Sequence, residues 1–227
     1  IVQYFNRVRF SDSYSNSSFK KRYFEIIYAL AGDVDHPFNA KRLHSKLSSL
    51  ALPDRDVWWT IFLNDSDYEE HNFHRFVTWT QKYGQTAPLS SEGRALLCIA
   101  ISWFFTSTNN SLRDGATRSL VELLSNQLQL AKHLLMDFEP VDDPYVQERV
   151  FLAIYGAALC SKYKEGLDEL CNYLIERFFS AEEVYPNVLV RDSARNICEH
   201  AVHFGFLDDS LGEYFRPPYN SKFPKKL

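Results

Sequence analysis

The stretches Leu112–Leu120, LRDGATRSL, and Val190–Cys198, VRDSARNIC, decide the fold. Both follow the order aliphatic residue, Arg, Asp, small residue, Ala. Arg113 and Arg191 lie 78 positions apart, and half of that distance reaches the middle of a helix predicted over 143–159. A period of about 39 residues is typical of HEAT and armadillo arrays, in which each helix pair buries its apolar face against the next pair. The sequence therefore predicts an all-α fold, an α-solenoid of antiparallel helix pairs.

Apolar residues spaced three and four positions apart predict helices along almost the whole chain. The predicted ranges are 19–30, 39–50, 54–64, 73–84, 90–105, 112–124, 127–136, 143–159, 164–179 and 187–204. Residues 1–10 are ambiguous between an edge strand and a helix. The stretch Leu96–Phe105 is apolar nearly all round, so we expect protein to cover it on every side.

We expect three regions along the chain. Residues 1–85 form a less regular helical lead-in, residues 86–207 form the HEAT-like repeats, and residues 208–227 form an extended strap. Pro217, Pro218 and Pro224 cannot continue a helix, and Tyr219 and Phe223 give the strap apolar surface. Such a strap would either cover the open end of the array or be offered to a partner as a recognition segment.

Composition excludes several classes of protein. A net charge of -4 argues against a general binder of nucleic acid or membrane surfaces, because such proteins usually carry an excess of Lys and Arg. The longest apolar run, Ala95–Phe105, is much shorter than the roughly 20 residues that span a bilayer. The chain begins at Ile1 without a secretion or transit signal, so we read it as a piece of a longer cytoplasmic protein.

Motifs for catalysis and metal binding are missing from the sequence. The pairs His71 and His74, and His200 and His203, have a spacing of three that can share a helix face, but a transition-metal site needs three or four convergent ligands. The four cysteines lie in apolar helical stretches, as expected of reduced, buried thiols. Neither a G-x-S-x-G elbow nor a G-x-x-x-x-G-K-[ST] phosphate loop occurs. We therefore expect no catalytic residue, no cofactor and no metal in these 227 residues.

The repeated charges are the first candidate site. Arg113 with Asp114, and Arg191 with Asp192, are neighbours in sequence, and adjacent residues do not face each other on a helix. Each side chain must therefore find its partner elsewhere. The four residues form either a structural ladder that fixes the register of the repeats or a row that binds a ligand.

The aromatic residues are the second candidate site. Four Trp, 13 Tyr and 18 Phe exceed what a solenoid core needs, and aromatic side chains are frequent anchors in protein interfaces. Trp58 and Trp59 lie about 100° apart on a helix, so both are buried only if that helix is covered broadly. Otherwise one of them faces a partner. The candidate partner contacts are Trp58, Trp59, Pro217, Pro218, Tyr219 and Phe223.

Five blocks, in matching order over about Pro53–Pro224, resemble large bacterial STAND NTPases of the Avs antiviral type. They are Ile101–Asn109 (ISWFFTSTN), Leu112–Thr117 (LRDGAT), Val141–Arg149 (VDDPYVQER), Leu189–Arg195 (LVRDSAR) and Pro217–Pro224 (PPYNSKFP). The resemblance implies a helical-repeat region that follows an ATP-binding switch module in proteins that sense a component of an invader. This chain departs from a complete member because it has no phosphate loop, so ATP hydrolysis is not expected of it.

The function expected from the resemblance is a non-catalytic protein-binding or sensor region. The partner would be a phage component or the parent's own ATPase module. Two alternatives stay open: a structural scaffold that only packs against that module, and a helical array that binds nucleic acid.

Overall fold

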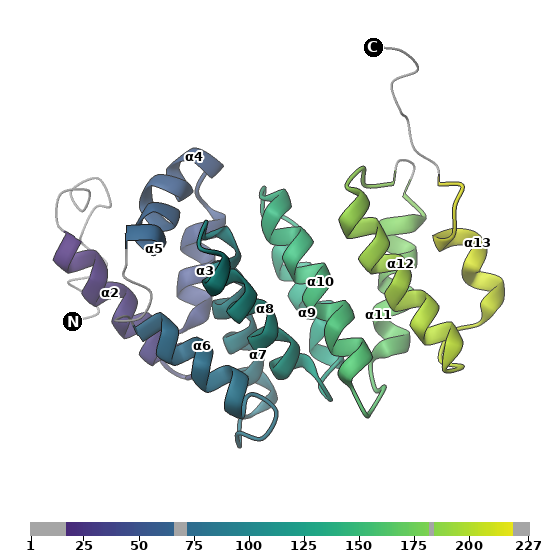
Figure 1. Cartoon of the computed structure of the whole chain (residues 1–227), viewed down its shortest axis with the longest axis horizontal. Coiled ribbons are helices and arrows are strands. Elements are labelled where there is room, and N and C mark those ends of the chain that lie inside the picture. The colour runs from purple at the N-terminus through teal and green to yellow at the C-terminus, as the bar shows by residue number, and fades with distance from the viewer. Residues whose placement is uncertain (1–16, 66–71, 182–183, 220–227) are drawn as a thin grey trace, which may run out of the picture. The chain divides into compact units, whose positions relative to one another are not determined.

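The structure is a computed structural model that describes residues 17–65, 72–181 and 184–219. Every regular element in these ranges is a helix, and no strand occurs among them (Figure 1). The predicted all-α fold is therefore confirmed for this part of the chain. The chain forms two compact units, Ile1–Ser119 and Leu120–Leu227. The division falls inside helix α8 (Asn110–Leu124) and not near residue 85, where the sequence predicted the lead-in to end.

Unit 1 is built around two aromatic segments, the turns at Asp56–Thr60 and Trp103–Thr106. Its helices are α2 (Ser17–Ala29), α3 (Ala40–Ser48), α4 (Leu52–Arg55), α5 (Ile61–Asp65), α6 (Asn72–Tyr83), α7 (Ser91–Ser102) and the first residues of α8, with a π-helical turn at Asp56–Thr60 and a 3-10 turn at Trp103–Thr106. Helix α2 packs against α3 and α6, and α3 packs against α7. The predicted burial of Leu96–Phe105 is confirmed, because every one of these side chains is buried.

Trp58 and Trp59 belong to the core of unit 1. They are 3% and 0% exposed, and the indole N–H of Trp59 donates to the carbonyl oxygen of Trp103 at 3.0 Å. The ring of Phe24, in α2, lies 5.0 Å from the ring of Trp58 and 4.8 Å from that of Trp59. The prediction that one of the two faces a partner is therefore wrong for this structure, because α2 and the turn after α7 cover the helix broadly.

Unit 2 contains the end of α8 and four further helices, followed by the short α13 (Gly212–Phe215). They are α9 (Gln129–Phe138), α10 (Pro144–Cys160), α11 (Leu167–Leu174), which runs into a π-helical turn at Ile175–Phe179, and α12 (Val188–His203). Helix α9 contacts α10 and α11, and α12 contacts α10 and α11. Each helix therefore packs against its neighbour in sequence or against the helix two places along the chain.

The starts of these helices are set by their caps. Asp143 accepts hydrogen bonds from the backbone N–H groups of Tyr145 and Val146, and Pro144 follows at the first helical position, where a missing N–H costs nothing. Asn187 caps α12 in the same way. These caps fix where α10 and α12 begin, as the sequence predicted for α10.

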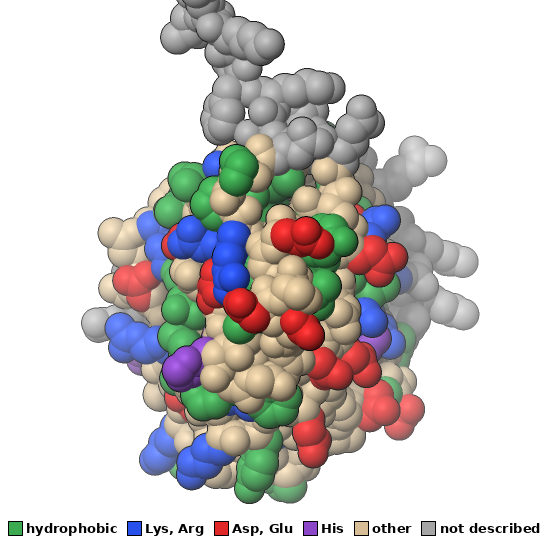
Figure 2. Space-filling view, turned by 90° about the vertical axis from the view of Figure 1, so that its right-hand side faces the viewer, with side chains coloured by type: hydrophobic (Ala, Val, Ile, Leu, Met, Phe, Trp, Pro, Cys, Tyr) green, Lys and Arg blue, Asp and Glu red, His purple; other side chains and the backbone are tan. Residues whose placement is uncertain are grey.

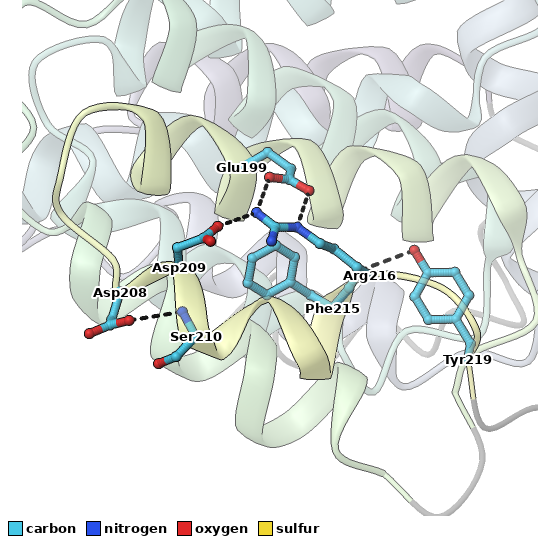
Figure 3. A network of polar contacts seen from close by, with 7 residues as sticks. All are labelled: Glu199, Asp208, Asp209, Ser210, Phe215, Arg216 and Tyr219. Atoms are coloured by element: carbon cyan, nitrogen blue, oxygen red, sulfur yellow. Dashed lines mark hydrogen bonds and ion pairs between the residues drawn. The ribbon is translucent and has the colours of Figure 1, made fainter.

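The C-terminal part of unit 2 differs from the predicted extended strap. Asp209–Leu211 form a 3-10 turn and α13 (Gly212–Phe215) a short helix, because the prolines exclude a helix only after Arg216. Arg216 binds Glu199 of α12 through two hydrogen bonds of 2.8 Å and Asp209 through one of 2.7 Å (Figure 3). Phe223 lies outside the described residues.

Candidate ligand-binding cavity

Unit 2 contains a cavity of about 630 Å³. Its apolar walls include Leu135, Phe138, Val150, Leu174, Val184 and Val190. Its polar lining includes Glu139, Gln147, Tyr173, Arg177, Tyr185 and Arg191. The walls come from α9, α10, α11 with its π-helical turn, the loop before α12, and the first turn of α12. Binding sites for small ligands and side chains typically have this size and a mainly apolar lining with a few polar groups.

Glu139 and Arg177 form an ion pair at the rim. Their closest N to O distance is 3.0 Å, and their side chains are 50% and 59% exposed, so water screens the pair and it adds little stability. The hydroxyl of Tyr173 donates to the other oxygen of Glu139 at 3.2 Å. Burial, with the neighbouring carboxylate, raises the pKa of Tyr173 to about 12, so this hydroxyl remains a donor at neutral pH.

Among the described residues that line the cavity, Arg191 is the charged residue that is buried. It is 9% exposed, and its Nη1 donates to the carbonyl oxygen of Tyr185 over a long 3.4 Å. The guanidinium lies over the ring of Tyr219, 5.4 Å from the ring centre, a cation–π arrangement. Nε has no hydrogen-bond partner among the described residues, and no carboxylate there pairs with the side chain. Buried guanidinium groups are normally paired, so this one is unusual.

The position of Arg191 recurs in other helices. Arg191 lies four residues after the cap Asn187 and donates to the carbonyl two residues before that cap. Arg113 lies four residues after Asn109 and donates to the carbonyl of Ser107 at 2.8 Å. The two segments that share the sequence pattern therefore also share this local contact.

The equivalent residue in α10 is Gln147, which lies four residues after Asp143 and donates to the carbonyl of Val141 at 3.2 Å. The sequence had placed the middle repeat five residues later, because it assumed an even spacing. The spacing is uneven, from 113 to 147 and from 147 to 191, since both the helices and the connecting loops differ in length. Sequence reasoning missed Gln147, although a long polar residue four positions after a cap could have identified it.

The four residues of the predicted charge row belong to both units, and of the two in unit 2 Arg191 lines the cavity. Arg113 is in α8 of unit 1, where its side chain donates a hydrogen bond to the carbonyl of Ser107 in the loop before α8. Asp192 is exposed and accepts from Arg195 at 2.6 Å within α12, and Asp114 is exposed on α8. Both arginines therefore bind the loops that precede their own helices, and the contacts of Asp192 with described residues, to Arg195 and Asn196, stay within α12.

Tyr219 is the part of the strap that reaches the cavity region. Its ring stacks on Phe179 at 5.9 Å, and its hydroxyl donates to the carbonyl of Phe215 at 3.1 Å. Pro217 and Pro218 are exposed. Tyr219 thus lies behind the guanidinium of Arg191, whereas the two prolines face outward.

The remaining candidates for chemistry include Lys164, which lies near both His200 and Cys160. Among residues 17–65, 72–181 and 184–219, no three His, Cys, Asp or Glu side chains are placed to hold a metal ion. His71 is outside these ranges. Nε2 of His200 lies 3.0 Å from the ammonium of Lys164, and burial together with this cation lowers the pKa of His200. Cys160 is exposed at the end of α10, so the prediction of four buried thiols is wrong at this position.

Two further findings bear on the kind of protein. Within the same described ranges, none of the helices combines the length and the apolar character that a bilayer crossing requires. Neither the protein-family models, nor the curated proteins, nor the solved structures include a match to this chain. The geometry and charge of the cavity are therefore the evidence for its role.

Proposed function

We propose that the chain is a non-catalytic protein-binding region and that it binds its partner in the cavity of unit 2. The observation that carries this proposal is a cavity of about 630 Å³ with apolar walls and a buried arginine, Arg191, that has no ion pair with the described residues. Interfaces obtain most of their affinity from a few apolar or aromatic side chains that fill pockets of this kind. A partner side chain that enters the cavity would lie between Val150 of α10 and Val190 of α12.

The proposed architecture around this cavity is a stack of antiparallel helix pairs. In such a stack α9 would pair with α10, and α11 with α12, while α9 packs on α11 and α10 on α12. The contacts within unit 2 agree with that pattern. The recurring cap and donor at α8, α10 and α12 support it from local geometry. Stacked pairs expose a row of loops and first turns, which is where the cavity opens.

The larger context that we propose is a bacterial antiviral STAND ATPase in the cytoplasm. This part of the proposal rests on the five sequence blocks that resemble that family. The partner would then be a phage protein. The alternative partner is the ATPase module of the parent chain, in which case the region would act as a scaffold.

A nucleic-acid partner fits the charges less well. On the face that carries α13, Lys and Arg side chains are interspersed with Asp and Glu, and the acidic ones gather on one side (Figure 2). Binding to the phosphate backbone generally uses a continuous basic surface. A protein partner is therefore the better supported proposal.

A peptide-display selection tests the proposal. The whole chain is used to select binders from a random peptide library, and the binders are re-measured against two variants. Val190→Trp places an indole into the cavity, whereas Val188→Trp adds the same group on the same helix at a position that is 63% exposed. We expect binding to be retained by V188W and lost by V190W, with far-UV circular dichroism showing that both variants are folded.

Two results would contradict the proposal: no enriched peptide, or peptides that bind V190W as well as they bind the unchanged chain. The sequences of the enriched peptides separate the two partner classes. Similarity to phage proteins would support a sensor, and similarity to the parent chain would support a scaffold.

A further inference from the structure

We infer that the cavity of unit 2 binds a carboxylate of the partner peptide through the Nε and Nη2 atoms of Arg191. The inference rests on the proposed function, because it names the chemistry of the segment that would enter the cavity. The peptide class is an acidic residue, or a free C-terminus, next to a large apolar side chain.

The hydrogen-bonding capacity of Arg191 points to an anion. A guanidinium has five N–H donors in a fixed plane. In Arg191, Nη1 makes one long bond to the carbonyl of Tyr185, and neither Nε nor Nη2 has a partner in the part of the chain that the structure describes. These two nitrogens form one edge of the group, and that edge matches the two oxygens of a carboxylate.

Unit 2 itself shows the geometry that such a pair would take. Arg216 uses Nε and Nη2 to bind the two carboxylate oxygens of Glu199, each at 2.8 Å (Figure 3). Arg191 has the same edge, and none of the described carboxylates binds it. The difference is that Arg191 is more than nine-tenths buried at the cavity wall, so its unpaired charge is less well hydrated than that of an exposed arginine.

The acidic residues that the structure describes around the cavity are already engaged elsewhere. Glu139 pairs with Arg177 and accepts from Tyr173. Glu148 accepts a hydrogen bond from Asn187. Glu148 and Asp142 lie near enough to Tyr185 to contribute to raising its pKa, after the larger effect of burial, but neither forms an ion pair with Arg191. No carboxylate in residues 17–65, 72–181 and 184–219 is therefore paired with Arg191, and its positive charge can be matched by a ligand.

The neighbouring groups define the rest of the ligand. The ring of Tyr219 covers one face of the guanidinium, so a carboxylate must approach in the plane of the group. The apolar walls formed by Phe138, Val150 and Leu174 favour an aliphatic or aromatic side chain beside that carboxylate. The segment 220–227 of this chain does not match, since it contains Lys222, Lys225 and Lys226 and no acidic side chain.

The test follows the Nε–H group of Arg191 directly. The whole chain, labelled with ¹⁵N, is titrated with N-acetylphenylalanine, which carries a carboxylate beside an aromatic ring, and separately with its carboxamide. The Nε–H signal of Arg191 is assigned by its loss in Arg191→Lys. We expect this signal to shift when the acid is added. We expect the affinity for the amide to be at least about tenfold lower than the affinity for the acid, because only the acid can form charge-assisted bidentate hydrogen bonds. Arg177→Lys, at the rim, is the matched control and should keep this preference.

Equal affinities for the acid and the amide, or an Nε–H signal that moves with neither, would overturn the inference. Because the comparison uses the unchanged chain, it does not depend on how Arg191→Lys folds. It is also independent of the peptide selection. A preference for the acid without enriched peptides would contradict only the protein-binding proposal, and enriched peptides without a preference for the acid would contradict only the inference.

Discussion

Replacing Gly166 by alanine should destabilise unit 2 more than any other single methyl addition at a loop glycine. Gly166 caps α11 with a φ of +82°, in the left-handed region that costs an L-residue about 1 to 2 kcal/mol. A Cβ at this position would lie 2.6 Å from both the N and the Cα atom of Gln129, at the start of α9. Because these are backbone atoms, the helices themselves would have to move apart, which adds about 1 to 3 kcal/mol.

Gly205→Ala is the matched control for this substitution. Gly205 also has a positive φ, of +74°, but a Cβ there would meet no atom within 4 Å. It should therefore lose only the conformational cost of about 1 to 2 kcal/mol, against a total of about 2 to 5 kcal/mol for Gly166→Ala.

Urea unfolding of the two variants, followed by far-UV circular dichroism, measures both losses. Tryptophan fluorescence is unsuitable because all four tryptophans belong to unit 1. The slope with denaturant should remain unchanged, so that the midpoint reports stability alone. Equal losses for the two variants would refute the reasoning, because they would show that α9 and the loop before α11 do not approach as closely as described.

Three further predictions concern the core, the C-terminal network and the thiols. Trp59→Ala should cost about 3 to 5 kcal/mol, because it removes a fully buried indole and its bond to Trp103, whereas the same change at the exposed Trp79 should cost little in a thermal melt. The hydrogen bonds from Arg216 lower the pKa of Glu199. This carboxylate therefore stabilises the fold above its unfolded pKa, and the stabilisation is lost as the pH falls through its folded pKa. Glu199→Gln should flatten the acid side of a plot of the free energy of unfolding against pH. One thiol, Cys160, should react with a disulfide reagent in the folded chain, and a second fast thiol would contradict the burial described here.

The helices could be predicted from the sequence because each combines an apolar stripe with a local start signal. The helix α10 illustrates this, since Asp143 and Pro144 fix its start and buried residues such as Val146, Val150 and Ala153 follow at helical spacing. The turn at Asp209–Phe215 was missed because its apolar pattern is too short to read, and it depends on the long-range pair between Arg216 and Glu199.

The cavity could be predicted only in part. Arg191 was identified from the repeated pattern, but its burial involves Tyr219, which lies 28 residues farther along the chain. Trp58 and Trp59 show the opposite case. A helix in isolation cannot reveal how much of its circumference its neighbours will cover, so their complete burial depended on tertiary contacts.

The donor that recurs four residues after each cap also governs how such a chain can grow during evolution. Arg113, Gln147 and Arg191 each anchor a carbonyl only two residues ahead of the cap, so the tether involves no residue farther upstream. Residues inserted earlier in the connecting loop would leave this tether and the helix after it unchanged, and the loop before α12, 180–187, is already longer than the loop before α10, 139–143. New recognition loops could therefore be acquired at these points without rebuilding the scaffold, whereas an insertion between the anchored carbonyl and the cap would disrupt it.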